Sequence, residues 1–121
     1  MDDKRIEPRI EHSGDVTVKV QSALSIVALE GRVFPCQTAD ISLGGMRFQT
    51  DVLLPVGSLL ELAIILYPTS QTYWHTGNVV WCKETDRKGQ YEAGISFKST
   101  INPQLDSWQR AIEKLPGKGE M

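Results

Sequence analysis

The sequence lacks the features that define secreted and membrane proteins. It has only two cysteines in 121 residues, Cys36 and Cys82, too few for the disulfide framework of a small secreted domain. Its longest apolar run, residues 59–66, is interrupted by Glu61 and is too short to span a bilayer. The chain begins Met-Asp-Asp-Lys-Arg, without the apolar segment of a signal peptide. We therefore expect a cytoplasmic protein with reduced, buried thiols and no membrane insertion.

An excess of basic residues is also missing. The chain carries 13 lysines and arginines against 15 aspartates and glutamates, and its formal net charge is −2. A chain with this balance has no overall positive field to attract a polyanion, so we expect no DNA or RNA partner. Its length allows one domain with its own core.

Groups with the spacing of a catalytic or metal site are absent too. The two histidines, His12 and His75, are far apart, and neither has a second ligand at metal spacing. No serine lies in a G-x-S-x-G turn, and the Leu43-Gly44-Gly45 segment lacks the Gly-Lys-Ser/Thr ending of a P-loop. We predict that the chain is not an enzyme and that it holds no metal or cofactor.

The pattern that dominates the chain is the alternation of apolar and polar residues. It is clearest at Val16, Val18 and Val20, and a period of two residues is typical of half-buried strands. Further strand-like segments lie at residues 31–39, 46–50, 59–67, 73–83 and 91–97, and residues 24–28 are interpreted as a continuation of the first strand. Turn residues lie at 44–45, 54–57 and 86–89, and Gly77 is a candidate bulge. The pattern predicts about six short strands.

A helix is expected after the last strand. Asn102 has the character of an N-cap and Pro103 that of a first helical residue. The apolar face of this helix comprises Leu105, Trp108, Ile112 and Leu115, and Pro116-Gly117 ends it. These elements predict a mainly β protein, a closed or nearly closed antiparallel barrel with the helix packed across one end. We divide the chain into a mobile N-terminal arm (1–14), the barrel with its helix (15–115) and a frayed tail (116–121).

Two arginines stand out in the N-terminal arm. Arg5 and Arg9 flank Pro8, which disfavours a helix interior. In an extended chain they point to the same side, up to about 13–14 Å apart. Guanidinium groups bind phosphates bidentately and stack on flat ring systems. Charged termini are common, however, so the arm alone does not establish a site.

A second motif follows at residues 40–45. Asp40 can accept two parallel hydrogen bonds, such as those that the Watson–Crick edge of guanine donates, and Ser42 adds a hydroxyl. Gly44 and Gly45 permit a left-handed φ and a close approach of the backbone. The same residues also suit an ordinary turn whose side chains satisfy local backbone groups. Together the two motifs indicate a receptor for a small dianion that carries hydrogen-bonding bases.

The order of these motifs resembles the PilZ domain, the bacterial receptor module for cyclic di-GMP. Arg5 and Arg9 match its R-x-x-x-R, and the later [D/N]-x-S-x-x-G is matched by Asp40, Ser42 and Gly45. Residues 77–81 and 91–97 are similar to the last barrel strands of the family. The resemblance covers roughly residues 4–115, and it implies a six-stranded antiparallel PilZ-type β-barrel with a C-terminal α-helix.

The resemblance also implies a ligand-binding role for each motif residue. Arg5 and Arg9 would grip the phosphates and the guanines, Asp40 and Ser42 would hold a guanine edge, and Gly45 would shape the turn beside Gly44. Lys4 stands where many members carry a further arginine, so it would add a phosphate contact. It leaves open whether one ligand or a stacked pair binds. Trp81 would line the site, with a place in the core or on the barrel surface as an equal alternative.

A single-domain PilZ protein is what the resemblance implies. It would bind cyclic di-GMP and signal through its N-terminal arm to a separate, unidentified partner protein, in the regulation of motility or biofilm formation. We expect a monomer or weak dimer. The alternative is a PilZ-fold protein–protein adaptor that does not bind nucleotide. A small barrel that binds single-stranded nucleic acid is the third possibility, and the acidic balance of the chain disfavours it.

Overall fold

The computed structural model describes residues 10–11, 14–23, 26–66, 71–98 and 104–115. Its elements in chain order are β1 (Ile10–Glu11), β2 (Asp15–Ser22), the short 3-10 turn η1 (Val27–Leu29), β3 (Val33–Ile41), β4 (Gly45–Thr50), β5 (Leu59–Leu66), β6 (Gln71–Glu84), β7 (Tyr91–Phe97) and α1 (Leu105–Lys114). The predicted number of barrel strands and the single C-terminal helix are both confirmed.

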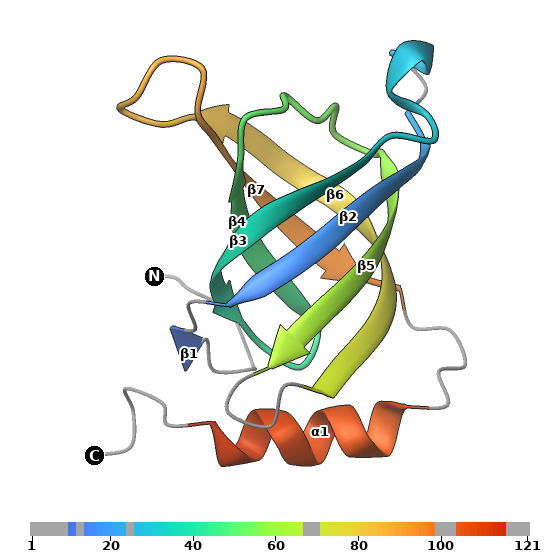
Figure 1. The fold of residues 1–121 in the computed structure, drawn as a ribbon, viewed down its shortest axis with the longest axis vertical. Coiled ribbons are helices and arrows are strands. Elements are labelled where there is room, and N and C mark those ends of the chain that lie inside the picture. Colours follow the sequence, from blue (N-terminus) through green and yellow to red (C-terminus); the bar gives the residue numbers. More distant parts are fainter. Residues whose placement is uncertain (1–9, 12–13, 24–25, 67–70, 99–103, 116–121) are drawn as a thin grey trace.

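Six strands form a closed antiparallel barrel (Figure 1). Their order around the barrel is β3-β2-β5-β6-β7-β4, and pairing between β3 and β4 closes the ring. The two-residue strand β1 adds to β3 beyond the point where β2 leaves it, with Ile10 opposite Ile41 and Glu11 opposite Asp40. Closure pairs the backbone groups of the strands with one another and leaves the ring without a free edge.

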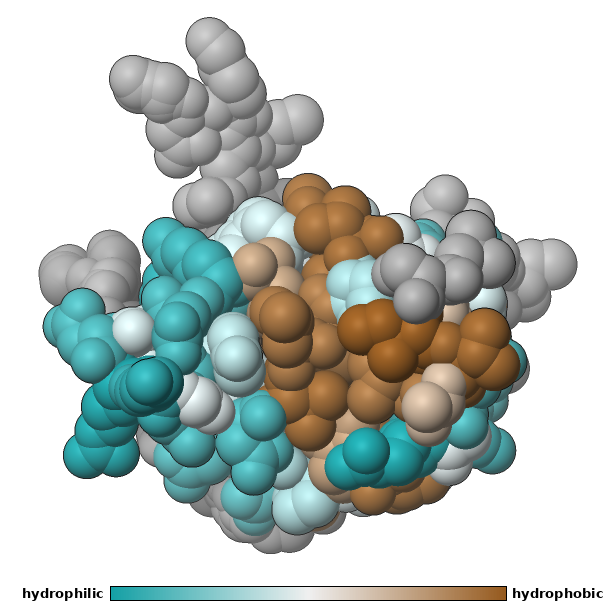
Figure 2. Space-filling model, turned by 90° about the horizontal axis from the view of Figure 1, so that it is seen from above, coloured by the Kyte–Doolittle hydropathy of each residue, from teal (hydrophilic) through white to brown (hydrophobic). Residues whose placement is uncertain are grey.

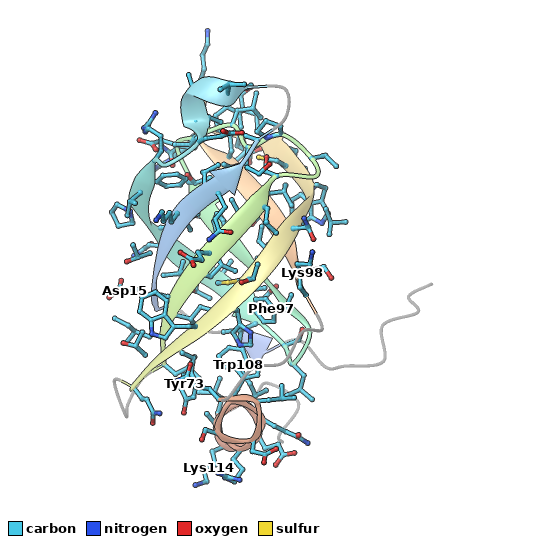
Figure 3. All side chains as sticks on the ribbon, turned by 90° about the vertical axis from the view of Figure 1, so that its right-hand side faces the viewer. Asp15, Tyr73, Phe97, Lys98, Trp108 and Lys114 are labelled. Atoms are coloured by element: carbon cyan, nitrogen blue, oxygen red, sulfur yellow. The ribbon has the colours of Figure 1, made fainter. Side chains whose placement is uncertain are left out.

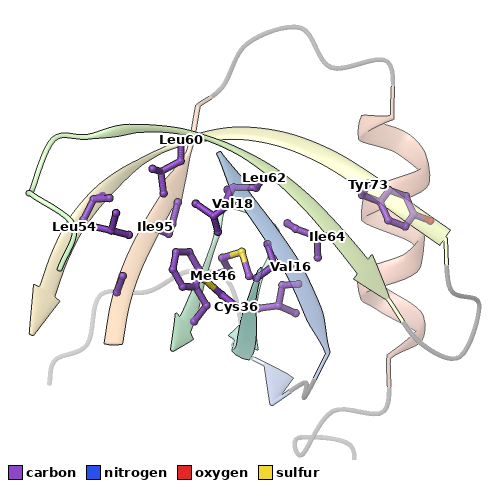
Figure 4. Close-up of a cluster of buried hydrophobic side chains, with 14 of the residues drawn as sticks. Val16, Val18, Cys36, Met46, Leu54, Leu60, Leu62, Ile64, Tyr73 and Ile95 are labelled. Atoms are coloured by element: carbon purple, nitrogen blue, oxygen red, sulfur yellow. The ribbon is translucent and has the colours of Figure 1, made fainter. Parts of the chain in front are cut away.

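The alternation of side chains determines what fills the barrel. On β2, Val16, Val18 and Val20 point inward and are at most 1% exposed, as the sequence predicted. The inward residues of the other strands meet them in one apolar core (Figure 4), which includes Cys36, Met46, Leu60, Leu62, Ile64 and Ile95. Full burial of one such side chain stabilises the fold by about 1.5–3 kcal/mol.

Helix α1 closes one end of the barrel through Trp108. This side chain is completely buried against the rings of Tyr73, His75 and Phe97 (Figure 3). Its indole N–H donates a hydrogen bond to the carbonyl oxygen of Leu43 at 3.2 Å. Trp108 therefore joins the helix both to the barrel and to the loop after β3.

Three details differ from the sequence prediction for the helix. The helix begins at Leu105 with Gln104 in the N-cap position, whereas the predicted cap, Asn102, lies outside the described residues. Gln104 bonds to β6 instead of capping: its Oε1 accepts from the Trp74 N–H at 2.8 Å, and its Nε2 donates to the Thr72 carbonyl at 3.1 Å. Leu105 is 52% exposed, so the prediction that it packs on the barrel is wrong.

Two strand predictions are also wrong. Residues 26–28 do not continue β2, because the chain turns through η1 after Ile26, and Ile26 and Val27 are exposed; residues 24–25 of the predicted range lie outside the described residues. Gly77 is not a bulge: the extra residue of β6 is Val80, between the pairs Val79–Ile95 and Trp81–Gly94. By contrast, the predicted turn at 54–57 is confirmed, with Gly57 at a φ of +92°.

Candidate functional site

Two β-bulges place the key side chains on the outside of the barrel. On β3, Thr38 faces Phe48 in the core and Asp40 faces Arg47, so Ala39 is an extra residue that shifts the alternation by one. Without this shift Asp40 would follow Thr38 into the interior. Val80 is likewise an extra residue on β6, and the shift in alternation that it causes places Trp81 on the outside of the barrel.

The outward residues form a continuous line across four neighbouring strands. Asp40 on β3 pairs with Arg47 on β4, Arg47 pairs with Gly94 on β7, and Gly94 pairs with Trp81 on β6. We call these four residues the four-strand row. Because adjacent strands lie about 4.8 Å apart, its two ends are up to about 14 Å from each other.

Asp40 is held at one end of the row by an ion pair. The Arg47 Nη2 atom lies 2.7 Å from the Asp40 Oδ2 atom, and the Asp40 side chain is only 8% exposed. The Arg47 Nη1 atom lies 3.5 Å from the Glu92 Oε1 atom on β7. The sequence analysis missed Arg47. Its position between the inward residues Met46 and Phe48 marks it as an outward residue, but only the register reveals its partner.

Trp81 lies directly against the backbone at the other end of the row. A Cβ atom added to Gly94 would be 2.3 Å from Trp81 Nε1, so the glycine is what allows the indole to lie flat on β7. The Lys83 ammonium group lies 5.3 Å from the centre of the Trp81 ring, within the range of a cation–π contact. The indole is half-buried and is not part of the core. Of the two structural places expected for it, the core and the barrel surface, it therefore occupies the barrel surface.

The loop from Ser42 to Gly45 is held from within the protein. The Ser42 backbone N–H and hydroxyl both donate to the Gly45 carbonyl, at 2.9 and 3.3 Å, as in an ordinary turn. The Gly44 carbonyl accepts from the Phe97 N–H at 2.8 Å. Gly45 is required for a close approach and not for a left-handed φ, because a Cβ atom there would be 2.3 Å from the Ile95 carbonyl oxygen.

The basic residues of the N-terminal motif, Lys4, Arg5 and Arg9, lie outside the described residues. The structure does show where the chain runs immediately after them. Residue 10 begins β1, and Glu11 of β1 is opposite Asp40 on β3. The R-x-x-x-R motif is thus followed directly in the sequence by a strand that pairs beside the carboxylate of the second motif.

The remaining titratable groups of interest, Cys36, Cys82 and His75, lie in the barrel core or against it. Cys36 is buried as predicted, but Cys82 is only half-buried, so the prediction of a buried thiol is wrong there. Burial raises the pKa of the Cys36 thiol to about 12 and also raises the pKa of Cys82. Both groups are therefore poor nucleophiles at neutral pH. Burial lowers the pKa of His75 to about 4, and its ring stacks on Phe97 with a centroid distance of 4.1 Å. These residues pack the core and do not line the four-strand row.

The barrel end opposite α1 carries an apolar patch on part of its surface (Figure 2). Figure 2 shows hydrophobic residues gathered over this end. Exposed apolar side chains come from the segment around η1, Ile26 and Val27, and from the connection between β4 and β5, Leu53 and Val56. Within the described part of the chain, no helix is long and apolar enough to cross a bilayer.

Comparison with known proteins gives a consistent family. The model of the PilZ domain matches residues 3–114. The solved PilZ domain of YcgR from Escherichia coli with c-di-GMP is 16% identical, with a TM-score of 0.69 over 93% of this chain and 92% of that chain. A search of curated proteins found no match.

Longer solved proteins match over part of their length. The inhibitor of motility MotI/DgrA from Bacillus subtilis is 14% identical, with a TM-score of 0.70 over 93% of this chain and 50% of that chain. The MrkH–c-di-GMP complex from K. pneumonia is 21% identical, with a TM-score of 0.64 over 94% of this chain and 50% of that chain. The chain thus spans about half the length of these two relatives. At these identities the likeness shows the fold.

Proposed function

The chain belongs to the PilZ domain family, and we propose that it is a cytoplasmic, non-catalytic receptor for cyclic di-GMP that signals to a separate protein. The observation that carries this proposal is the four-strand row. It presents a carboxylate, a guanidinium group and an indole on one face of the barrel, next to the strand that follows the R-x-x-x-R motif.

The bases of the ligand are read by the two ends of the row. Asp40 offers its carboxylate to the N1–H and the exocyclic amine of a guanine, two donors at the spacing of the two carboxylate oxygens. Trp81 offers an aromatic face, and stacking of a base on such a face is worth about 1–3 kcal/mol. Both groups are fixed by the strands that carry them, so little ordering is needed when a base arrives.

The phosphates are bound by the N-terminal arm. Arg5 and Arg9 supply guanidinium forks for the two phosphates and for the base edges, and Lys4 adds a positive charge. The strand β1 supports this assignment, because it begins directly after Arg9 and pairs with β3 at Asp40 and Ile41. Ser42, Gly44 and Gly45 contribute by fixing the loop beside this strand.

Signalling follows from ordering the arm. Fixing each backbone residue costs about 1–2 kcal/mol, and each charge-assisted hydrogen bond returns about 1.5–3 kcal/mol, so several bonds are needed before the arm is held. We assign this role to residues 1–14, of which Ile10–Glu11 already pair with β3, with residues 15–115 as the receptor body. A partner protein then reads the changed shape and charge of this face. Because MotI is an inhibitor of motility, motility proteins are the first partners to test.

Calorimetric titration of the purified chain with cyclic di-GMP tests the function directly. We expect binding in the micromolar range or tighter, with little or none for GTP and cyclic di-AMP as controls. The same titration gives the stoichiometry, one ligand or a stacked pair. The absence of both heat and a thermal shift at high ligand concentration would contradict the proposal.

A second candidate function is a PilZ-fold adaptor without nucleotide binding. The observation in its favour is that the second motif makes bonds within the chain: Asp40 pairs with Arg47, and Ser42 bonds to Gly45. For an adaptor, pull-down of a partner protein would be indifferent to added cyclic di-GMP. For the receptor, it would depend on the nucleotide.

A further inference from the structure

The ion pair between Asp40 and Arg47 occupies the acceptor that the proposed ligand requires. The Arg47 Nη2 atom is 2.7 Å from Asp40 Oδ2, and Asp40 is 6% exposed. A hydrogen bond between two charged groups is roughly twice as strong as one between neutral groups, and burial limits its competition with water. A guanine edge needs both oxygens of Asp40. Each oxygen can accept two hydrogen bonds, but a carboxylate this buried leaves little open approach to Oδ2 while Arg47 lies against it, so the two donors compete for that position.

Arg47 has a second partner to which it can move. The Glu92 carboxylate lies on the opposite side of Arg47, with Oε1 at 3.5 Å from Nη1 and a side chain that is 17% exposed. The Arg47 Nε atom is covered and donates to no acceptor among the described residues. The guanidinium group therefore has one short bond to Asp40, one long contact with Glu92 and an unused donor. A small rotation toward Glu92 would exchange the first for the second.

We propose that Arg47 is a specificity-determining residue. Its ion pair with Asp40 excludes base edges other than guanine from that carboxylate, and we call this exclusion the guard. This inference rests on the proposed function, since it assumes a cyclic dinucleotide ligand. Guanine brings two adjacent donors and replaces the lost bond with two. Adenine brings one donor, its amine, beside an acceptor, N1, which faces a carboxylate oxygen unfavourably. It cannot compensate for displacing Arg47, and the cost of an unsatisfied buried group then opposes binding.

Glu92 is the positioning residue in this arrangement. When guanine occupies Asp40, Glu92 holds the displaced guanidinium group and lowers the cost of displacement. Neutralising Glu92 would therefore leave Arg47 more firmly on Asp40 and weaken guanine binding. That effect requires Arg47, so it disappears once Arg47 is replaced. This dependence distinguishes the guard from a direct effect of Glu92 on the ligand.

The direction in which Arg47→Met changes the affinity for cyclic dinucleotides distinguishes the guard from a simple electrostatic effect. Removing a positive charge from the site of a dianion should weaken the binding of every cyclic dinucleotide. The guard predicts the opposite: cyclic di-GMP binds about threefold tighter and cyclic di-AMP about thirtyfold tighter, so that discrimination falls about tenfold, or about 1.4 kcal/mol. Arg87→Met removes the same charge from the exposed loop between β6 and β7 and should change neither affinity.

The experiment is a set of calorimetric titrations with both dinucleotides on the full chain, its Arg47→Met, Glu92→Gln and double variants, and the Arg87→Met control. Weaker binding of both ligands to Arg47→Met, or an unchanged ratio, overturns the guard while leaving the receptor function intact. If the original chain binds neither ligand but Arg47→Met binds both, the guard is supported. If neither protein binds, both proposals fail. Should Arg47→Met not fold, Arg47→Gln keeps a neutral donor for Asp40 and is expected to loosen discrimination in the same direction.

Discussion

The indole of Trp81 occupies the space that a Cβ atom on Gly94 would need, at 2.3 Å from Nε1. The two residues face each other across β6 and β7, and the absence of a side chain on one allows the other to lie flat on the sheet. The half-buried aromatic face of the proposed site thus depends on a glycine in a neighbouring strand.

Replacing Gly94 with alanine should displace Trp81. Because the new methyl group meets a large ring, we expect a loss of stability of about 1–3 kcal/mol and a roughly tenfold weaker affinity for cyclic di-GMP. Urea unfolding followed by tryptophan emission, together with calorimetry, measures both effects. Ser96→Ala, an exposed position on the same face of β7, is the matched control and should change stability by less than about 0.5 kcal/mol. An unchanged emission spectrum and affinity for Gly94→Ala would show that Trp81 takes no part in binding.

Replacing Arg5 or Arg9 with alanine should abolish binding without unfolding the barrel. Each change removes charge-assisted bonds worth about 1.5–3 kcal/mol, which corresponds to a loss of affinity of more than tenfold. Calorimetry gives the affinity and a thermal melt checks the fold. Arg32→Ala, at an exposed position before β3, is the charge-matched control. Wild-type affinity in both arm variants would remove the arm from the site.

Replacing Asp40 with alanine should weaken the binding of cyclic di-GMP and reduce its advantage over cyclic di-AMP. The substitution removes the two acceptors for a guanine edge and leaves Glu92 as the carboxylate beside Arg47 among the described residues. Competition titrations with the two dinucleotides measure the ratio of affinities. If discrimination stays intact while affinity falls, Asp40 has a role other than reading guanine.

Acidification should destabilise the protein through His75. Its pKa is lowered from 6.5 to about 4 because the ring is buried between Phe97 and Trp108. Between these two values the unfolded chain binds a proton that the folded chain excludes, so stability is lost as the pH falls from about 6.5 toward 4, by up to about 3 kcal/mol. Urea unfolding at pH 7, 6 and 5 measures the slope. His75→Phe keeps the stacking and should flatten the slope in this range; an equal slope in both proteins would assign the effect to other groups.

Much of the fold could be predicted because each barrel strand buries one face. The repeat of Val16, Val18 and Val20 is enough to identify β2 and its inward side, and Tyr91 and Phe97 bound β7 as the sequence indicated. The turn at Gly57 was equally clear, because proline and glycine restrict the backbone locally. These features depend on short stretches of sequence, and the closed barrel follows from their number and spacing.

The features that escaped prediction depend on how separate segments align. Arg47 could be recognised as outward from its neighbours, but its pairing with Asp40 depends on the bulge at Ala39. Likewise, whether Leu105 faces the barrel depends on where the helix meets β6, which the bonds of Gln104 determine. Among the site residues, the sequence supplied Asp40 and Trp81 but not the Arg47 that lies between them. The ligand contacts of all of them remain predictions.

The extra residues Ala39 and Val80 have a consequence for how this protein would respond to mutation. Val80 is 54% exposed, so in a library of substitutions it should accept many side chains and appear unimportant. Deletion of either residue would keep the facing of the site, because Trp81 would then follow Val79 directly and Asp40 would follow Thr38 directly. Trp81 and Asp40 would stay outside the barrel and Cys82 would stay on the inner face. A scan by single-residue deletion should therefore find two tolerant positions inside barrel strands, where the loss of a residue ordinarily turns every following side chain to the other face of the sheet.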